Sequence, residues 1–332
     1  MTQKLIMYFE PVIQEYKEIL EKNTPKGFKM CYWEEIPENE RQKKLTEVEY
    51  FLVVSSVVDK KLIENAHNLR HIQRTGIGYD NIDIKTANKC GITVSNFPTG
   101  NSVAAAEHAI LLILAVYRNL ININNDTKEG KWPLWKYRTK SYEMDGKIHG
   151  FIGFGNIGRE TAKRSISFGT KIIYYDLIRA TREIENAYSA TFLSFEEVIC
   201  KSDILSIHVP LTPENQGLIG REEINMMKKD AILINISRGG LVDEMALYEA
   251  LKRGDLSGAG IDTWENEPVI SNNPLFDLDN VVATSHIAAG TIDTFVKQVK
   301  GSFNNIVKVD TAGKPDFVVG EQSKSQERRC CR

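Results

Sequence analysis

The chain has 332 residues, of which 42% are hydrophobic and 26% charged, and its formal net charge is −2. This composition is that of an ordinary globular protein and gives no sign of a basic nucleic-acid or membrane surface. A chain of this length is long for one core, so two domains are expected.

Targeting and redox signals are weak. The apolar start of the chain is broken by Glu10 and Pro11, and no window is apolar for long enough to span a membrane. The five cysteines have no metal-ligand spacing, which predicts free thiols and no metal site. Together these features predict a cytoplasmic protein.

The first 98 residues alternate short apolar strands with helical patterns. Strands are expected at 4–9, 50–55 and 91–96, and helices at 11–22 and 59–67. The glycine-punctuated stretch TGIGYDNID, residues 75–83, predicts a loop that leads into a helix. Strands that alternate with helices favour a parallel sheet.

A break at Pro98-Thr99-Gly100 precedes a long helical pattern at 101–120, for which Asn101 or Ser102 is the expected cap. This helix is apolar nearly all round, so it should be buried between domains or subunits. A polar arm containing two tryptophans, Trp132 and Trp135, follows it.

A second series of strands and helices begins near residue 147. Its strands are expected at 149–154, 171–176, 203–209, 231–236, 258–264 and 281–286. The last helical pattern, 291–309, is expected to return to the first domain and make that domain discontinuous. The predicted domains are therefore 1–98 with 290–320, and 99–289, followed by a disordered tail at 321–332.

The motif Gly153-x-Gly155-x-x-Gly158 lies between a predicted strand and a predicted helix. In that context the glycines permit a tight turn, close approach of a pyrophosphate and helix–strand packing. Asp176 ends the next strand, where a carboxylate accepts hydrogen bonds from ribose hydroxyls and favours NAD over NADP. Arg179 lies nearby and weakens that preference. The motif alone does not establish redox chemistry.

Alcohol oxidation at a nicotinamide also needs a base, and six histidines are available. His286 ends a strand at the edge of the sheet where doubly wound folds bind ligands, so it is the predicted base. The other five are expected to be solvated (His67, His71), packed (His108), on the far side of the sheet (His149) or structural (His208).

A cation that holds an anionic substrate is the third requirement. Arg238 follows a buried strand, and the two glycines after it are expected to leave room for a ligand; the alternative is a salt bridge to Asp243 or Glu244. The carboxylate that orients the base has three candidates, between which periodicity does not choose: Asp262, Glu265 and Glu267.

Several long motifs occur in the same order along this chain as in a known protein family. GKIHGFIGFGNIGRE, HVPLTPENQGLIG, INISRGGLVDEMAL, GAGIDTWENEP and SHIAAGT resemble the signatures of the D-isomer-specific 2-hydroxyacid dehydrogenases. The resemblance implies an α/β protein with two doubly wound parallel-sheet domains. One is a Rossmann domain that binds NAD and carries a dimerisation helix and arm, and the other is a discontinuous, flavodoxin-like substrate domain.

The resemblance also implies residue roles. Arg238 would bind the substrate, His286 would act as acid/base, and Glu267 would be its partner. Backbone N–H groups around Ile77 and Gly78 would hold the substrate carboxylate. The expected NAD contacts are Gly153, Gly155, Asn156, Ile157, Gly158, Asp176, Val209, Ile236 and Asp262.

The expected function is reversible hydride transfer between NAD and a small 2-hydroxy or 2-oxo acid, in a homodimer without nucleic-acid or membrane partners. Within the family the motifs most resemble 3-phosphoglycerate dehydrogenases, which is one alternative. Ser55, however, stands where those enzymes usually have an arginine for the phosphate, and their regulatory domains have no counterpart in the sequence. A second alternative is an NAD-sensing protein like the C-terminal-binding-protein corepressors. The sequence does not identify the substrate acid.

Overall fold

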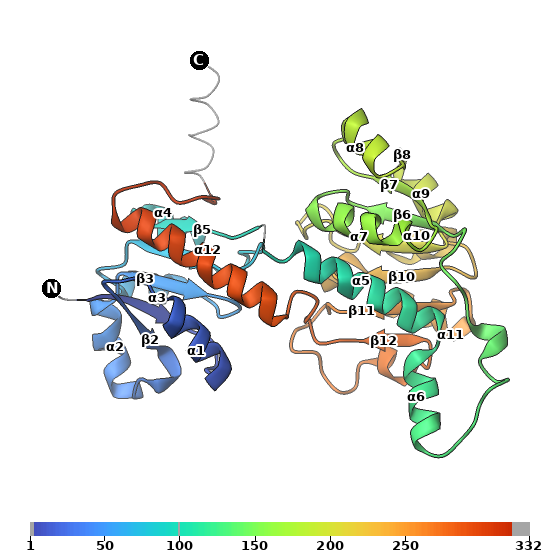
Figure 1. Cartoon of the computed structure of the whole chain (residues 1–332), viewed down its shortest axis with the longest axis horizontal. Helices are drawn as coiled ribbons and strands as arrows, with labels where there is room; N and C mark the ends of the chain where they lie inside the picture. The colour runs from blue at the N-terminus through green and yellow to red at the C-terminus, as the bar shows by residue number, and fades with distance from the viewer. Residues whose placement is uncertain (1–2, 99, 321–332) are drawn as a thin grey trace. The chain divides into compact units, whose positions relative to one another are not determined.

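The computed structural model describes residues 3–98 and 100–320 and divides the chain into two compact units (Figure 1). Unit 1 comprises Met1–Asn101 and Thr291–Arg332, and unit 2 comprises Ser102–Gly290. The sequence prediction had divided the chain after residues 98 and 289. The tail predicted for 321–332, with Cys330 and Cys331, lies outside the described residues.

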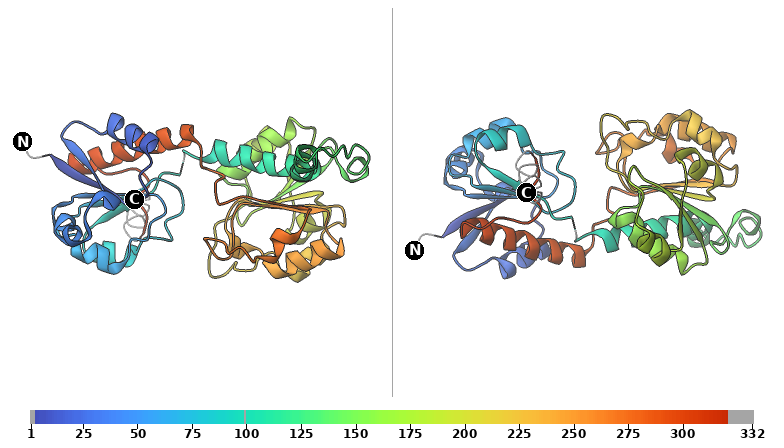
Figure 2. Two further views of the ribbon diagram at one scale, coloured as in Figure 1. Left: turned by 90° about the horizontal axis from the view of Figure 1, so that it is seen from below. Right: turned by 90° about the horizontal axis from the view of Figure 1, so that it is seen from above.

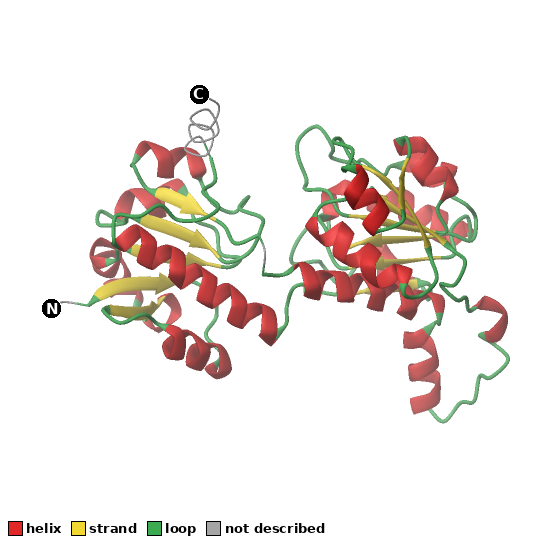
Figure 3. Ribbon diagram, turned by 45° about the horizontal axis from the view of Figure 1, so that its top comes forward, coloured by secondary structure: helices red, strands yellow, loops and turns green. Residues whose placement is uncertain are grey.

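Unit 1 is a five-stranded parallel sheet in the order β2-β1-β3-β4-β5, with helices on both faces (Figures 2 and 3). This is the flavodoxin-like order expected for a doubly wound sheet. The strands are β1 (Lys4–Tyr8), β2 (Phe28–Tyr32), β3 (Tyr50–Val53), β4 (His71–Arg74) and β5 (Thr93–Ser95). The helices are α1 (Gln14–Asn23), α2 (Glu38–Glu47), α3 (Lys60–Asn65), α4 (Ile84–Lys89) and α12 (Ile292–Asp310), with a 3-10 turn η1 at Trp33–Glu35.

Alternation along the strands builds two cores. Ile6 and Tyr8 of β1 pack with Phe295 and Val299 of α12, whereas Met7 packs on the opposite face with the residues of α2, α3 and α4. Because successive strand residues point to opposite faces, one strand serves both cores. The helix predicted at 291–309 therefore belongs to unit 1.

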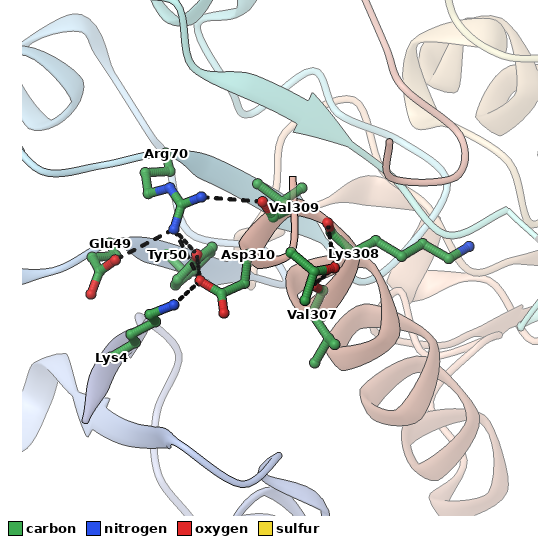
Figure 4. A network of polar contacts seen from close by, with 9 residues as sticks. Lys4, Glu49, Tyr50, Arg70, Val307, Lys308, Val309 and Asp310 are labelled. Atoms are coloured by element: carbon green, nitrogen blue, oxygen red, sulfur yellow. Dashed lines mark hydrogen bonds and ion pairs between the residues drawn. The ribbon is translucent and has the colours of Figure 1, made fainter. Parts of the chain in front are cut away.

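Polar contacts fix the C-terminal end of α12 at the amino edge of this sheet (Figure 4). Asp310 accepts hydrogen bonds from Tyr50 Oη (3.0 Å) and Arg70 Nη1 (3.0 Å), and it pairs with Lys4. Arg70 Nη1 also donates to Tyr50 Oη (2.7 Å), and its Nη2 donates to the carbonyl of Val309 (3.2 Å). These groups begin β1 and β3 or directly precede β4, so the cluster ties three strands to one helix end.

Strands β2 and β4 were not predicted, and the reason is clearest for β4. Its sequence, HIQR, looks polar, but His71 and Gln73 are fully buried and bond to each other (3.2 Å). Ser95 of β5 and Asn305 of α12 complete the cluster by donating to Gln73 Oε1 (2.8 and 3.0 Å). The prediction that His71 is solvated was wrong, and burial lowers its pKa to about 4.

Unit 2 is a seven-stranded parallel sheet in the order β12-β11-β10-β9-β6-β7-β8. Its strands are β6 (Ile148–Ile152), β7 (Lys171–Tyr175), β8 (Ala190–Phe192), β9 (Ile204–Ile207), β10 (Ile232–Asn235), β11 (Gly258–Ile261) and β12 (Val281–Ala283). The order reverses between β6 and β9, and such a reversal is where doubly wound sheets bind ligands. The two doubly wound sheets confirm the predicted fold class; of the seven strands only the three-residue β8 was missed.

Helices cover both faces of the second sheet (Figure 3). They are α5 (Ser102–Tyr117), α6 (Leu120–Lys128), α7 (Asn156–Ile166), α8 (Arg182–Ala187), α9 (Phe195–Lys201), α10 (Arg221–Met226) and α11 (Glu244–Arg253). The 3-10 turns are η2 (Arg138–Lys140), η3 (Gly239–Leu241) and η4 (Pro274–Asp277).

The helix predicted at 101–120 begins at Ser102 and stops at Tyr117, because Asn119 adopts a left-handed conformation (φ 49°) before α6 begins. It packs directly on β11, where Gly258 and Gly260 make room: a Cβ on either would come within 2.8 Å of Val116 or Leu112. Within the described residues no single helix is long and apolar enough to cross a membrane, although the pair α5 and α6, bent by 63°, passes by length and composition.

Candidate active site

The glycine loop joins β6 to α7 at the reversal of strand order. Gly153 has a φ of +93°, and a Cβ on it would lie 2.8 Å from the backbone of His208, the residue after β9. A Cβ on Gly158 would lie 2.6 Å from the carbonyl oxygen of Gly153. Gly155, by contrast, has nothing within 4 Å of its would-be Cβ. Two glycines therefore allow tight packing, and the third leaves open space at the N-terminus of an 11-residue helix.

Asp176 follows β7 at the same edge of the sheet. Its Oδ2 accepts a hydrogen bond from the backbone N–H of Phe154 (2.7 Å), so the carboxylate is held beside the glycine loop. Open space at Gly155, a helix N-terminus and an anchored carboxylate are the features that a dinucleotide requires. The residues of this edge therefore fit NAD.

His208 and His149 lie beneath this loop. The His208 ring stacks on Phe151 with 5.5 Å between centroids, and neither ring nitrogen has a hydrogen-bond partner among the described residues. Burial lowers the pKa of His208 to about 3. His149 contacts the hydroxyls of Ser165 (2.8 Å) and Ser206 (2.7 Å). Burial lowers the pKa of His149 as well, so both rings are neutral at physiological pH and neither serves as a general acid.

Arg238 is held by the polar residues around it. Asn235 Nδ2 donates to the carbonyl of Arg238 (2.9 Å), Ser237 Oγ donates to the carbonyl of Val209, and Arg238 Nη1 donates to the carbonyl of Ser237 (2.8 Å). The two carboxylates proposed as alternative partners bind other groups: Asp243 caps α11 at Ala246, and Glu244 accepts from Glu265 N and Asn273.

The glycines after Arg238 do not form the open space expected from the sequence. A Cβ on Gly239 would come within 1.8 Å of the Trp264 backbone, and one on Gly240 within 3.2 Å of Leu211. Gly239 is needed because the η3 turn packs directly on the loop after β11. This part of the argument for a ligand beside Arg238 was wrong.

His286 and Glu267 form a close pair. His286 Nδ1 lies 2.7 Å from Glu267 Oε2, and Glu267 Oε1 accepts the N–H of Trp264 (3.0 Å). His286 has a φ of +54°, a conformation that non-glycine residues rarely adopt. Because Nδ1 faces the carboxylate, Nε2 is the ring nitrogen left for exchange of a proton with a substrate.

The three candidate carboxylates have three different partners. Glu265 exchanges hydrogen bonds with Glu244 at the start of α11. Asp262 is fully buried; its Oδ1 accepts from Thr284 Oγ1 (2.6 Å) and Ile287 N (2.9 Å), and its Oδ2 accepts from Ala288 N (2.9 Å). Asp262 thus anchors the loop that carries His286, a role that the sequence did not reveal.

His108 was expected to be a packed residue of the long helix. Its Nε2 lies 3.1 Å from Thr284 Oγ1 and 3.5 Å from Asp262 Oδ1, and its side chain is only 13% exposed. His108 therefore joins the polar cluster behind the His286 loop, which the apolar pattern of its helix concealed.

Ile77 and Gly78 belong to unit 1, in the loop after β4. The carbonyl of Ile77 accepts from Asn96 Nδ2 (2.7 Å), and the carbonyl of Gly76 accepts from Phe97 N (3.1 Å). Both residues are partly exposed at the carboxyl edge of the five-stranded sheet.

The two sheets and the loop between β6 and α7 define a dinucleotide-binding α/β protein. Residues 110–288 match the family model of the "D-isomer specific 2-hydroxyacid dehydrogenase, NAD binding domain". The chain belongs to this family, whose members are NAD-dependent oxidoreductases that act on CH–OH groups.

Individual relatives agree with that membership. The chain is 44% identical over 244 residues to the glyoxylate reductase of Thermococcus litoralis, covering 72% of this chain and 73% of that protein. It is 39% identical over 287 residues to the D-3-phosphoglycerate dehydrogenase of Archaeoglobus fulgidus, covering 86% of this chain but only 53% of that protein, about half its length. Its structure matches that of the TT0316 protein from Thermus thermophilus with a TM-score of 0.85 and 29% identity, covering 95% and 100% of the two chains.

Proposed function

We propose that this protein catalyses reversible reduction of a small, unphosphorylated 2-oxo acid to the D-2-hydroxy acid with NADH. The observation that carries the proposal is the contact of His286 Nδ1 with Glu267 Oε2 at 2.7 Å, because it leaves Nε2 to give a proton to the substrate's carbonyl oxygen. Arg238 would bind the substrate carboxylate and polarise the carbonyl group, with backbone N–H groups near Ile77 and Gly78 as further donors.

NADH would supply the hydride for reduction of the oxo acid, and NAD⁺ would accept it in the reverse reaction. Its proposed contacts are Gly153, Gly155, Asn156, Ile157, Gly158, Asp176, Val209, Ile236 and Asp262. The open space at Gly155 and the position of Asp176 beside the loop support this set. Residues 102–290 would then form the NAD-binding domain, and 1–101 with 291–320 the substrate domain.

The carboxyl edge of unit 1 favours an unphosphorylated substrate. Glu10 Oε1 accepts the N–H groups of Val54, Ser55 and Ser56 at 2.7–2.9 Å, and its Oε2 accepts from Ser55 Oγ (2.7 Å). Burial opposes ionisation of Glu10, but these hydrogen bonds outweigh it and lower its pKa. The donors that a phosphate would use at this loop are therefore occupied by an anion, which would repel it.

This anion lies close to the proposed substrate loop. Asn81 Nδ2 donates to the carbonyl of Ser56 (2.7 Å), and Val58 N donates to the carbonyl of Asn81 (2.8 Å). The loop held by Glu10 and the loop of Ile77 and Gly78 are thus bonded to each other. Oxidation of 3-phosphoglycerate is the second candidate function, because the similar protein of Archaeoglobus fulgidus is named a D-3-phosphoglycerate dehydrogenase.

The first experiment is NADH consumption with glyoxylate, pyruvate, hydroxypyruvate, 3-phosphohydroxypyruvate and 2-oxoisocaproate, with Arg238→Ala as control. We expect the highest kcat/KM with an unphosphorylated acid and loss of activity in the control. Preference for 3-phosphohydroxypyruvate would replace the first candidate by the second. NADH binding without turnover of any acid would favour a corepressor-like binding protein.

The proposed assembly is a cytoplasmic homodimer. Large apolar side chains are exposed along α5, α6 and the following arm: Val103, Leu111, Leu120, Ile121, Trp132, Leu134 and Trp135. A second copy of the chain would cover such a surface. Light scattering should give about twice the chain mass of 37.6 kDa, and Leu111→Arg should shift it toward one chain.

A further inference from the structure

Arg179, three residues after Asp176, is held by a carboxylate from helix α8. Its Nε donates to Glu185 Oε1 (2.8 Å), and its Nη2 donates to Glu185 Oε2 (3.0 Å). Its guanidinium also lies over the ring of Phe192, 5.4 Å from the centroid. Two parallel hydrogen bonds fix the plane of a guanidinium as well as its position.

Glu185 is itself fixed by the core of unit 2. Tyr174 Oη donates to Glu185 Oε1 (2.8 Å), and Tyr174 Oη in turn accepts the N–H of Ala180 (3.0 Å). The Glu185 side chain is 10% exposed, whereas that of Arg179 is 61% exposed. Hydrogen bonds from Arg179 and then Tyr174 lower the pKa of Glu185, so it stays ionised. The buried carboxylate therefore determines where the exposed guanidinium lies.

The charge at this edge is unfavourable for one of the two nicotinamide dinucleotides. In NAD-binding folds an acid at the end of this strand accepts a hydrogen bond from the 2′-hydroxyl of the ribose. In NADP that hydroxyl carries a phosphate of about −1.5 to −2 charges. Asp176 would repel that phosphate, and an arginine beside the ribose is the usual means of accepting it. Arg179 lies at the right place in the chain, but Glu185 takes two of its five N–H donors and so fixes the plane and direction of the guanidinium.

We infer that Glu185 is a specificity-determining residue: it keeps Arg179 from a 2′-phosphate and so reinforces the preference of Asp176 for NAD. The inference rests on the dinucleotide-binding part of the proposed function and not on which acid is the substrate. The competing explanation is that the pair only joins α8 to the loop after β7, as many exposed ion pairs do with little energetic effect.

Equilibrium binding of NADH and NADPH by calorimetry separates the two explanations without any turnover. The test variant is Glu185→Gln, which removes the charge and keeps the shape. The matched control is Glu183→Gln on the same helix, where the carboxylate is bonded to Thr181 instead of Arg179. Both variants change the net charge equally, so an effect of charge alone appears in both.

We expect the wild type to bind NADH more tightly than NADPH. Glu185→Gln should tighten NADPH binding about tenfold, the effect of one charge-assisted hydrogen bond at a partly exposed site, with NADH binding changed less than twofold. Glu183→Gln should leave the ratio of the two dissociation constants unchanged. Adding Arg179→Gln to Glu185→Gln should abolish the gain, because the gain requires the released guanidinium.

An unchanged ratio in Glu185→Gln, or a gain that survives Arg179→Gln, would overturn the inference. If Glu185→Gln fails to fold, Arg179→Gln alone decides: the inference requires the ratio to stay within twofold of the wild type, and a weaker NADPH affinity would refute it. If the wild type does not bind NADH, the dinucleotide site itself is contradicted. That result differs from failure of the inference about Glu185, which concerns only the ratio of NADH to NADPH affinity.

Discussion

Replacing Asp262, a proposed NAD contact, by asparagine should damage the active site without removing any group proposed to touch the oxo acid. Asp262 anchors the His286 loop through Thr284 Oγ1, Ile287 N and Ala288 N, and its own carbonyl accepts the N–H of His286 (2.7 Å). That loop contains a residue at φ +54°, a conformation that costs about 1–2 kcal/mol and must be enforced by its surroundings.

The size of the effect follows from counting acceptors. An asparagine oxygen in place of Oδ1 keeps the bonds to Thr284 and Ile287, but its amide nitrogen then faces the N–H of Ala288. A buried donor without an acceptor costs about 1–3 kcal/mol. In the opposite orientation of the amide, two donors, those of Thr284 and Ile287, would lose their acceptor instead of one. Since a displacement of about 1 Å can lower a rate by about 10²-fold, kcat should fall by about 10–100-fold.

Urea unfolding and steady-state turnover should be measured together, with Asp203→Asn as control. Asp203 accepts from Ile148 N (2.7 Å) and Lys228 (2.8 Å) at the amino edge of the same sheet, away from the His286 loop. We expect both variants to lose stability and only Asp262→Asn to lose kcat. If Asp262→Asn is destabilised like the control but keeps kcat within twofold, the anchoring argument is wrong.

Four other perturbations have defined outcomes. Arg238→Lys keeps the charge but loses the planar fork, so kcat/KM for the oxo acid should fall about 10–100-fold in steady-state assays while NADH affinity by calorimetry is unchanged. His286→Ala should lower kcat about 10²–10⁴-fold, and Glu267→Gln should also lower kcat, because the carboxylate at Nδ1 orients the imidazole ring; an unchanged kcat removes Glu267 from its proposed role. Because the pKa of His71 falls from 6.5 to about 4, unit 1 should keep its full stability above pH 6.5 and lose up to about 3 kcal/mol as the pH falls to 4. Urea unfolding at pH 7 and 4.5 should show a loss of stability that is larger in the wild type than in His71→Gln, because the acidic groups are common to both proteins.

The sequence predicted those parts of the fold in which one local pattern decides the structure. The spacing of Gly153, Gly155 and Gly158 predicts the loop because glycine is needed at these positions for tight packing or for open space. Apolar runs such as 231–236 predict buried strands. Strand β4 was missed because His71 and Gln73 satisfy each other only once β5 and α12 are in place. That compensation is tertiary, so no local pattern reports it.

The candidate site divides in the same way. Residues in the loops that follow a strand, such as Arg238 after β10 and His286 after β12, could be found from their position alone, whereas choosing Glu267 over Asp262 and Glu265 required the family resemblance. Periodicity could not separate the three because their roles depend on which loop each one meets. The error about Gly239 has the same origin, since the neighbour that requires a glycine there is Trp264, far away in sequence.

The polar residues of these motifs form a chain of contacts along the carboxyl edge of the second sheet. Ser237 after β10 binds the carbonyl of Val209 after β9, the carbonyl of Asn235 in β10 accepts Asp262 N, and Asp262 after β11 holds the loop of His286 after β12. Each loop is thus positioned by its neighbour and not by its own sequence. Because parallel strands deliver such residues to one edge in fixed order, Ser237 beside Arg238 and Asp262 behind the His286 loop hold these two proposed catalytic groups there.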